Sequence, residues 1–191
     1  MNSIADVFRG GTLAIDRGLP YARILEKKYG FDKVKIVPSP NGDISAFLHD
    51  PKFEQQCFVT SEPLAARHAG VPVKVFPVSD SGYNPYTTVL ATRGNPQHRE
   101  YTRALAMIAA IREGWQTYLA SPAATNAKMH ALNPSMDLAT FAEVADAQKP
   151  YIEAPELGTM ATARWETLIA QLKDLGDIPE TILADKCFRS L

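Results

Sequence analysis

Three short stretches of the sequence combine residue types that could bind a small molecule. They are Asp16–Tyr21 (Asp-Arg-Gly-Leu-Pro-Tyr), Thr60–Pro63 (Thr-Ser-Glu-Pro) and Asp80–Tyr86 (Asp-Ser-Gly-Tyr-Asn-Pro-Tyr). Each holds a carboxylate next to turn-forming or hydroxyl residues, and such polar groups fix the orientation of a ligand in a pocket. Because loops carry function more often than the elements they connect, all three are candidate binding loops.

Each stretch also has a purely structural interpretation. Gly18 allows close approach of a backbone to a ligand, but it also suits an ordinary strand-to-helix turn. Glu62 in the first turn of a helix could bind a ligand or could simply complement the helix dipole. Tyr83 and Tyr86 offer flat rings with polar tips that suit an aromatic ligand, yet they could instead pack on a neighbouring domain.

The residues between these stretches predict an α/β fold with a mostly parallel sheet. Short apolar runs of strand type alternate with helical patterns in the first half of the chain, which is typical of βαβ units. The predicted strands are Thr12–Ile15, Lys33–Val37, Gln56–Thr60, Val73–Val78 and Thr87–Thr92, and the predicted helices are Pro20–Tyr29, Asp43–Leu48 and Pro63–His68. Ligands bind outside the carboxyl ends of such strands, where the three stretches lie.

After Gly94 the pattern is almost entirely helical. The predicted helices are Pro96–Ala120, Ala123–Leu132, Asp137–Gln148, Thr159–Leu175 and Pro179–Cys187. Thr159 is a candidate N-cap, and Gly176 is a candidate C′ residue. We therefore expect an α/β ligand-binding lobe in residues 1–94 and a helical C-terminal region in residues 95–191.

Composition excludes several functional classes. The 191 residues carry 20 Lys and Arg against 21 Asp and Glu, for a net charge of −1, which argues against a nucleic-acid binder. The sequence shows neither a transmembrane segment nor a signal peptide. Two cysteines and four scattered histidines predict no metal site. With Cys57 expected to be buried in a strand, and without a G-x-S-x-G motif or a phosphate loop, we expect neither an enzyme nor a bound cofactor.

Part of the sequence resembles the NMT1/THI5-like family, the periplasmic substrate-binding proteins of ABC importers. Gln55–Leu64 followed by Ser81–Tyr86 carries the resemblance, and Arg9–Ile15 is similar to the strand before the family's ligand loop. Relatives include the thiamine-pyrimidine, alkanesulfonate and taurine binding proteins. The resemblance implies a type II periplasmic binding protein-like clamshell, in which the helices after Gly94 return to the other lobe. It also implies that the opening strands of that lobe precede Met1.

The resemblance further implies which residues face the ligand. Carried over position by position, these are Gly18, Leu19, Pro20, Tyr21, Ser61, Glu62, Tyr83, Asn84 and Tyr86. Glu62 and Asn84 would hydrogen-bond a pyrimidine, sulfonate or nitrate-like ligand, and a tyrosine ring would cover its face. Hinge closure would present the loaded protein to a membrane permease in the periplasm.

Two alternatives remain open at the level of sequence. A fungal relative of the family is a pyrimidine precursor synthase, but it relies on a cysteine-rich stretch that the lone Cys57 and Cys187 do not supply. The chain could also be a ligand-sensing or orphan lobe, since exposed apolar helix faces favour association into a homodimer. An upstream extension with a signal peptide would favour the importer component.

Overall fold

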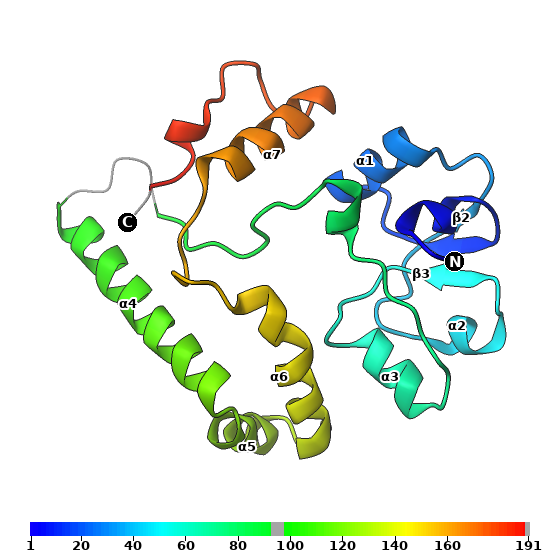
Figure 1. The fold of residues 1–191 in the computed structure, drawn as a ribbon, viewed down its shortest axis with the longest axis horizontal. Helices are drawn as coiled ribbons and strands as arrows, with labels where there is room; N and C mark the ends of the chain where they lie inside the picture. The colour runs from blue at the N-terminus through cyan, green and yellow to red at the C-terminus, as the bar shows by residue number, and fades with distance from the viewer. Residues whose placement is uncertain (93–97, 190–191) are drawn as a thin grey trace. The chain divides into compact units, whose positions relative to one another are not determined.

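The computed structural model describes residues 1–92 and 98–189 (Figure 1). By its internal contacts the chain divides into two compact units. The first unit consists of Met1–Pro85 together with Met160–Leu191, and the second is Tyr86–Thr159. The assignment of residues 1–94 and 95–191 to two lobes stays a prediction.

The first unit contains a small parallel sheet. Its strands are β1 (Thr12–Ala14), β2 (Lys35–Val37) and β3 (Phe53–Gln55), in the order β2-β1-β3. Thr12 pairs with Lys35 on one side and with Phe53 on the other, so β1 is the central strand. Parallel neighbours need a crossover connection, and α1 (Pro20–Tyr29) and α2 (Ser45–His49) lie in the two crossovers. A parallel α/β arrangement is therefore confirmed, and it is compatible with part of a periplasmic binding protein-like fold.

A hydrophobic core joins the central strand to α1. Its buried members are Ile4, Phe8, Leu13, Ile15, Ala22, Leu25, Phe31 and Val34. The ring of Phe8 stacks on Tyr29 at 5.1 Å and on Phe31 at 5.4 Å between ring centroids. Because this core fixes both the end of β1 and the body of α1, it also fixes the loop that joins them.

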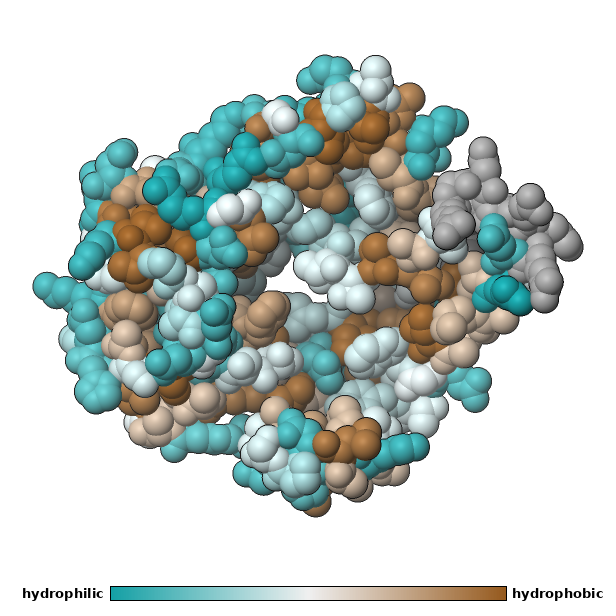
Figure 2. Space-filling view, turned by 180° about the vertical axis from the view of Figure 1, so that it is seen from behind, coloured by the Kyte–Doolittle hydropathy of each residue, from teal (hydrophilic) through white to brown (hydrophobic). Residues whose placement is uncertain are grey.

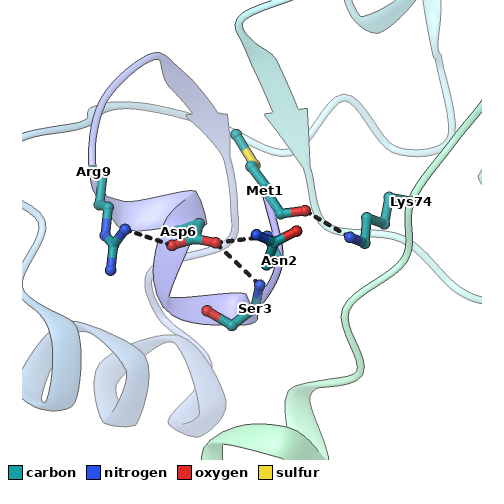
Figure 3. A network of polar contacts seen from close by, with 6 residues as sticks. All are labelled: Met1, Asn2, Ser3, Asp6, Arg9 and Lys74. Atoms are coloured by element: carbon teal, nitrogen blue, oxygen red, sulfur yellow. Dashed lines mark hydrogen bonds and ion pairs between the residues drawn. The ribbon is translucent and has the colours of Figure 1, made fainter.

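A short 3-10 helix, η1 (Ile4–Phe8), precedes the sheet and is held by one carboxylate (Figure 3). Asp6 accepts hydrogen bonds from the backbone N–H groups of Asn2, at 2.6 Å, and Ser3, at 3.1 Å. These bonds, chiefly, hold the pKa of Asp6 below its usual value, and the Arg9 guanidinium at 2.8 Å adds to the effect. Lys74 donates to the carbonyl of Met1 at 2.6 Å, which fastens an extended segment beside this helix.

Three of the predicted strands differ from the structure. The third strand is Phe53–Gln55 rather than Gln56–Thr60, and Val73–Val78 and Thr87–Thr92 form no strand. The prediction failed because apolar and β-branched residues supply strand propensity but not a partner. After the Gln56 N–H bonds the carbonyl of Ala14, the chain turns through a bond from Ser61 to Phe58 and leaves the sheet.

The other helices of the first unit are α3 (Glu62–His68), α7 (Thr162–Asp174) and two 3-10 helices, η2 (Val78–Ser81) and η3 (Ala184–Lys186). Helix α7 begins after Ala161, so the prediction of Thr159 as its N-cap was wrong. The predicted helix Pro179–Cys187 contains only the short turn η3, where Asp185 and Lys186 pair.

The end of α7 is as predicted, with Gly176 at the C′ position. Gly176 has φ +73°, and its N–H bonds Lys173 at 2.8 Å while the N–H of Asp177 bonds Leu172 at 2.9 Å. These two bonds define a Schellman motif. Arg23 of α1 donates to the carbonyl of Leu175 at 2.7 Å, and cations at a helix C-terminus are stabilising. Helix α7 is therefore fastened to the same helix that follows the first candidate loop.

The second unit is helical. It contains α4 (His98–Ala120), α5 (Ala123–Leu132) and α6 (Leu138–Ile152). The predicted start of the first helix, at Pro96, lies outside the described residues. Tyr118 donates to Asn126 at 3.0 Å across the turn between α4 and α5, and both residues are buried. Satisfied polar pairs of this kind fix how helices pack.

Apolar side chains also reach the surface, where they form brown patches among teal hydrophilic residues (Figure 2). On α4, Met107 is 52% exposed, and Leu105 and Ile111 are each 40% exposed. Helix α4 therefore buries only part of its apolar stripe within the described residues. None of the described helices is long and apolar enough to span a membrane.

Candidate functional site

An open groove lies at the carboxyl ends of β1 and β2. It has a volume of about 510 Å³. Its lining residues are Ile15, Asp16, Arg17, Gly18, Ile36, Val37, Pro38, Ser39 and Asn41. Two of the three sides of this list come from the ends of neighbouring parallel strands, which is where ligands bind in open α/β sheets. The groove therefore marks the candidate binding site.

The loop from Asp16 to Pro20 forms one wall of the groove. The Asp16 carboxylate accepts a hydrogen bond from the Gly18 N–H at 3.1 Å, which holds the loop in a tight turn. Leu19 is 43% exposed and caps α1, and Pro20 is the first residue of that helix. Helix α1 therefore begins directly behind the groove, as the sequence predicted.

Tyr21 is tied to this loop through a residue that sequence reasoning missed. The amide oxygen of Gln56 accepts hydrogen bonds from the Tyr21 hydroxyl and, at 2.8 Å, from the Asp16 N–H. Burial, together with the nearby charge of Asp16, raises the pKa of Tyr21 to about 12, so the hydroxyl stays protonated and remains a donor. Gln56 was placed inside a strand by its apolar neighbours. Its position directly after β3 is the signal that could have found it.

Ser61 and Glu62 follow the same strand. Glu62 opens α3, and its carboxylate accepts the backbone N–H of Phe58 at 2.9 Å. Ser61 occupies the N-cap position, although its side chain makes no capping bond there. Glu62 thus shapes the loop that begins at Gln56, and its role toward a ligand stays a prediction.

The third candidate loop contacts α7. The amide oxygen of Asn84 accepts from Arg164 at 2.7 Å, and the N–H of Tyr83 donates to the Ser81 hydroxyl at 3.3 Å. Burial, followed by the charge of Asp177, raises the pKa of Tyr83. Tyr86 belongs to the second compact unit. The structure thus brings the first loop together with Gln56 and joins the third loop to α7.

Sequence reasoning also missed the loop that follows β2. Pro38, Ser39 and Asn41 line the groove, and Asn41 has a left-handed backbone with φ +50°. Asparagine tolerates this conformation better than most residues. The signal again is position, because this loop leaves the carboxyl end of the strand beside β1.

Glu54 gives the sheet an unusual electrostatic feature. Its side chain is partly buried, and its Oε2 atom is buried without a hydrogen-bond partner. Burial, with a smaller contribution from Asp50, raises the pKa of Glu54 to about 7. Gly11 permits this packing, because a Cβ there would lie 3.0 Å from that oxygen and 2.5 Å from the carbonyl oxygen of Lys52.

Metal-binding side chains do not gather among the residues that the structure describes, since these contain no group of three or more His, Cys, Asp or Glu able to hold an ion. Both cysteines are free thiols. Cys57 is exposed in the loop after β3 rather than buried in a strand, so the prediction of a small core residue there was wrong. The chain leaves the sheet before reaching Cys57, which removes the cover that a strand would have provided.

Comparison with known proteins gives one match. No curated protein matches the chain. Residues 11–125 match the family described as NMT1/THI5 like. This range covers more than half of the 191 residues and includes all three candidate loops and the groove. The chain belongs to the NMT1/THI5-like family.

Proposed function

We propose that the chain is a solute-binding component of an ABC importer that reversibly binds a small polar or heteroaromatic molecule. The family includes such substrate-binding proteins as well as synthases. The observation that carries the proposal is the groove of about 510 Å³ at the carboxyl ends of β1 and β2. This volume lies within the range of small-molecule pockets. The ligand is a pyrimidine, a sulfonate or a nitrate-like anion.

The groove offers polar groups from backbone and side chains. Gly18 lets a ligand approach the backbone, and the N-terminus of α1 behind it favours a hydrogen-bond acceptor or an anion. The Asp16 carboxylate and the Asn41 amide, which line the same groove, offer further hydrogen bonds. Binding needs only such groups, whereas the synthase alternative would need reactive side chains at the same edge.

Tyr21, Glu62 and Asn84 complete the proposed site. A tyrosine ring covers the ligand, and Glu62 and Asn84 hydrogen-bond its polar groups. Closure of the protein over the ligand then presents it to a permease in the periplasm. The two exposed carboxyl-edge loops, which begin at Asp16 and Gln56, support this arrangement because one hydrogen-bond pair already joins them.

Calorimetric titration of the full chain with cytosine, taurine and nitrate tests the proposal. One of these probes should bind, and Ser39→Trp should abolish that binding because an indole at this position fills the groove. Ser121→Trp is the matched control, since Ser121 is exposed between α4 and α5. If none of the three probes binds, or if Ser39→Trp binds as well as the wild type, the groove is not the ligand site.

A further inference from the structure

The backbone passes between the two compact units twice. It leaves the first unit after Pro85 and returns to it at Met160. Every change in the relation of the two units must therefore be absorbed by backbone torsions near these two crossings. The groups that hold each crossing segment decide where those torsions can change.

Arg164, in the first turn of α7, holds the outgoing crossing. Its Nε donates to the carbonyl of Asn84. Its Nη2 donates to the Asn84 side-chain oxygen at 2.7 Å and to the carbonyl of Pro85 at 2.8 Å. One guanidinium thus joins the last two residues before the first crossing to a residue four positions after the second. Both crossings are fastened to each other within the first unit.

Arg112, on α4, holds the returning crossing from the second unit. Its Nε donates to the carbonyl of Leu157 at 2.6 Å. The next residue, Gly158, has φ +83°, a conformation that side-chain-bearing residues rarely adopt. The hydroxyl of Thr159 donates to Glu156 at 2.8 Å, which closes a turn just before the crossing.

We propose that Arg164 and Arg112 are positioning residues that confine movement between the two units to short backbone segments. On the returning crossing this segment is residues 158–161, between the Leu157 anchor and the start of α7. On the outgoing crossing it begins directly after Pro85. The proposal concerns the connection between the units and does not depend on the ligand or on the proposed function.

The planar fork of arginine explains the choice of residue at position 164. Three acceptors on two adjacent residues are reached from two nitrogens in fixed geometry, and a lysine ammonium on a flexible stem cannot reproduce that arrangement. Charge-assisted hydrogen bonds are also stronger than neutral ones. Loss of the fork should free the residues around Pro85 while leaving the sheet and α7 folded.

Spin-label distance measurements can test this, because the chain carries its own internal reference. Cys57 and Cys187 are exposed free thiols, and both belong to the first unit. Labels on this native pair report on the first unit alone. Labels on Cys57 and on Lys128→Cys, in a Cys187→Ser background, report on the two units, since Lys128 is exposed on α5.

Arg164→Ala should broaden the distribution of distances between the labels at 57 and 128 and leave the distribution between 57 and 187 unchanged. Arg164→Lys should also broaden the first distribution, which keeps the test available if the alanine variant does not fold. Arg112→Ala should act in the same direction. Arg67→Ala, on an exposed arginine of α3, is the control and should change neither distribution.

Two outcomes overturn the proposal. If both distributions broaden with the Arg164 variants, the residue only stabilises the first unit. If the distribution between 57 and 128 keeps its wild-type width in the Arg164 and Arg112 variants, the two arginines do not confine the crossings.

Discussion

At the scale of single residues, Glu62 has a contact of its own and a proposed contact with ligand. Its carboxylate holds the Phe58 N–H at 2.9 Å. Glu62→Ala should weaken ligand binding by roughly 1–3 kcal/mol, because it removes a charged hydrogen-bond partner. Calorimetry with whichever probe binds the wild type measures the effect.

Two variants separate the roles of Glu62. Glu62→Gln keeps an oxygen for Phe58 but removes the charge, so affinity should still fall while the loop is retained. Asp32→Ala alters an exposed carboxylate ahead of β2 and should leave affinity unchanged. An unaltered affinity in Glu62→Ala would remove this residue from the site.

Glu54 makes stability depend on pH. Its pKa rises from 4.5 to about 7 on folding, so between these values the folded chain keeps a proton that the unfolded chain has released. The folded state then binds more protons, and the free energy of unfolding should fall as pH rises through this window. Urea unfolding at about pH 5 and about pH 8 measures the difference.

Glu54→Gln should abolish most of this pH dependence, because the amide cannot ionise. Glu180→Gln is the control, since the side chain of Glu180 is 86% exposed, and its pH dependence should match the wild type. An identical slope in Glu54→Gln and the wild type would show that the buried carboxyl does not titrate in this range.

At the scale of elements, the end of α7 depends on one glycine. Gly176 has φ +73° in the Schellman motif, and Gly176→Ala should destabilise the protein by about 1 kcal/mol or more through backbone strain. Gly114→Ala is the opposite case, because Gly114 lies inside α4 with open space around it. It should stabilise by roughly 1 kcal/mol. Urea unfolding of both variants should show opposite signs, and equal effects would refute the argument from conformation.

The same elements show what the sequence could predict. Helix signals are local, so Pro20 and Gly30 marked the ends of α1, and the predicted range Ala123–Leu132 is that of α5. Strands depend on a partner elsewhere in the chain, which is why Val73–Val78 was predicted as a strand and forms none. At the site, loop position was predictable, whereas Gln56 and Asn41 required the register of the sheet.

At the scale of the whole molecule, family and parallel sheet agree with the sequence, while the grouping of elements required the structure. The helical pattern after Gly94 gave no sign that α7 would contact α1. That contact depends on side chains far apart in sequence, with Arg23 paired to Asp177 and Lys27 to Asp174. Exposed pairs of this kind are individually weak. They are also invisible to periodicity, which reports only which face of a helix is apolar.

The double hydrogen bond of Gln56 has a consequence for the order of folding. Its amide oxygen joins the Asp16 backbone across 40 residues and Tyr21 across 35. Contacts of such sequence separation form late, because a long loop must close first. During synthesis, a nascent chain that ends before Gln56 can form α1 but cannot lock the turn in front of it. The binding edge is therefore assembled last in the sheet, by the arrival of its third strand.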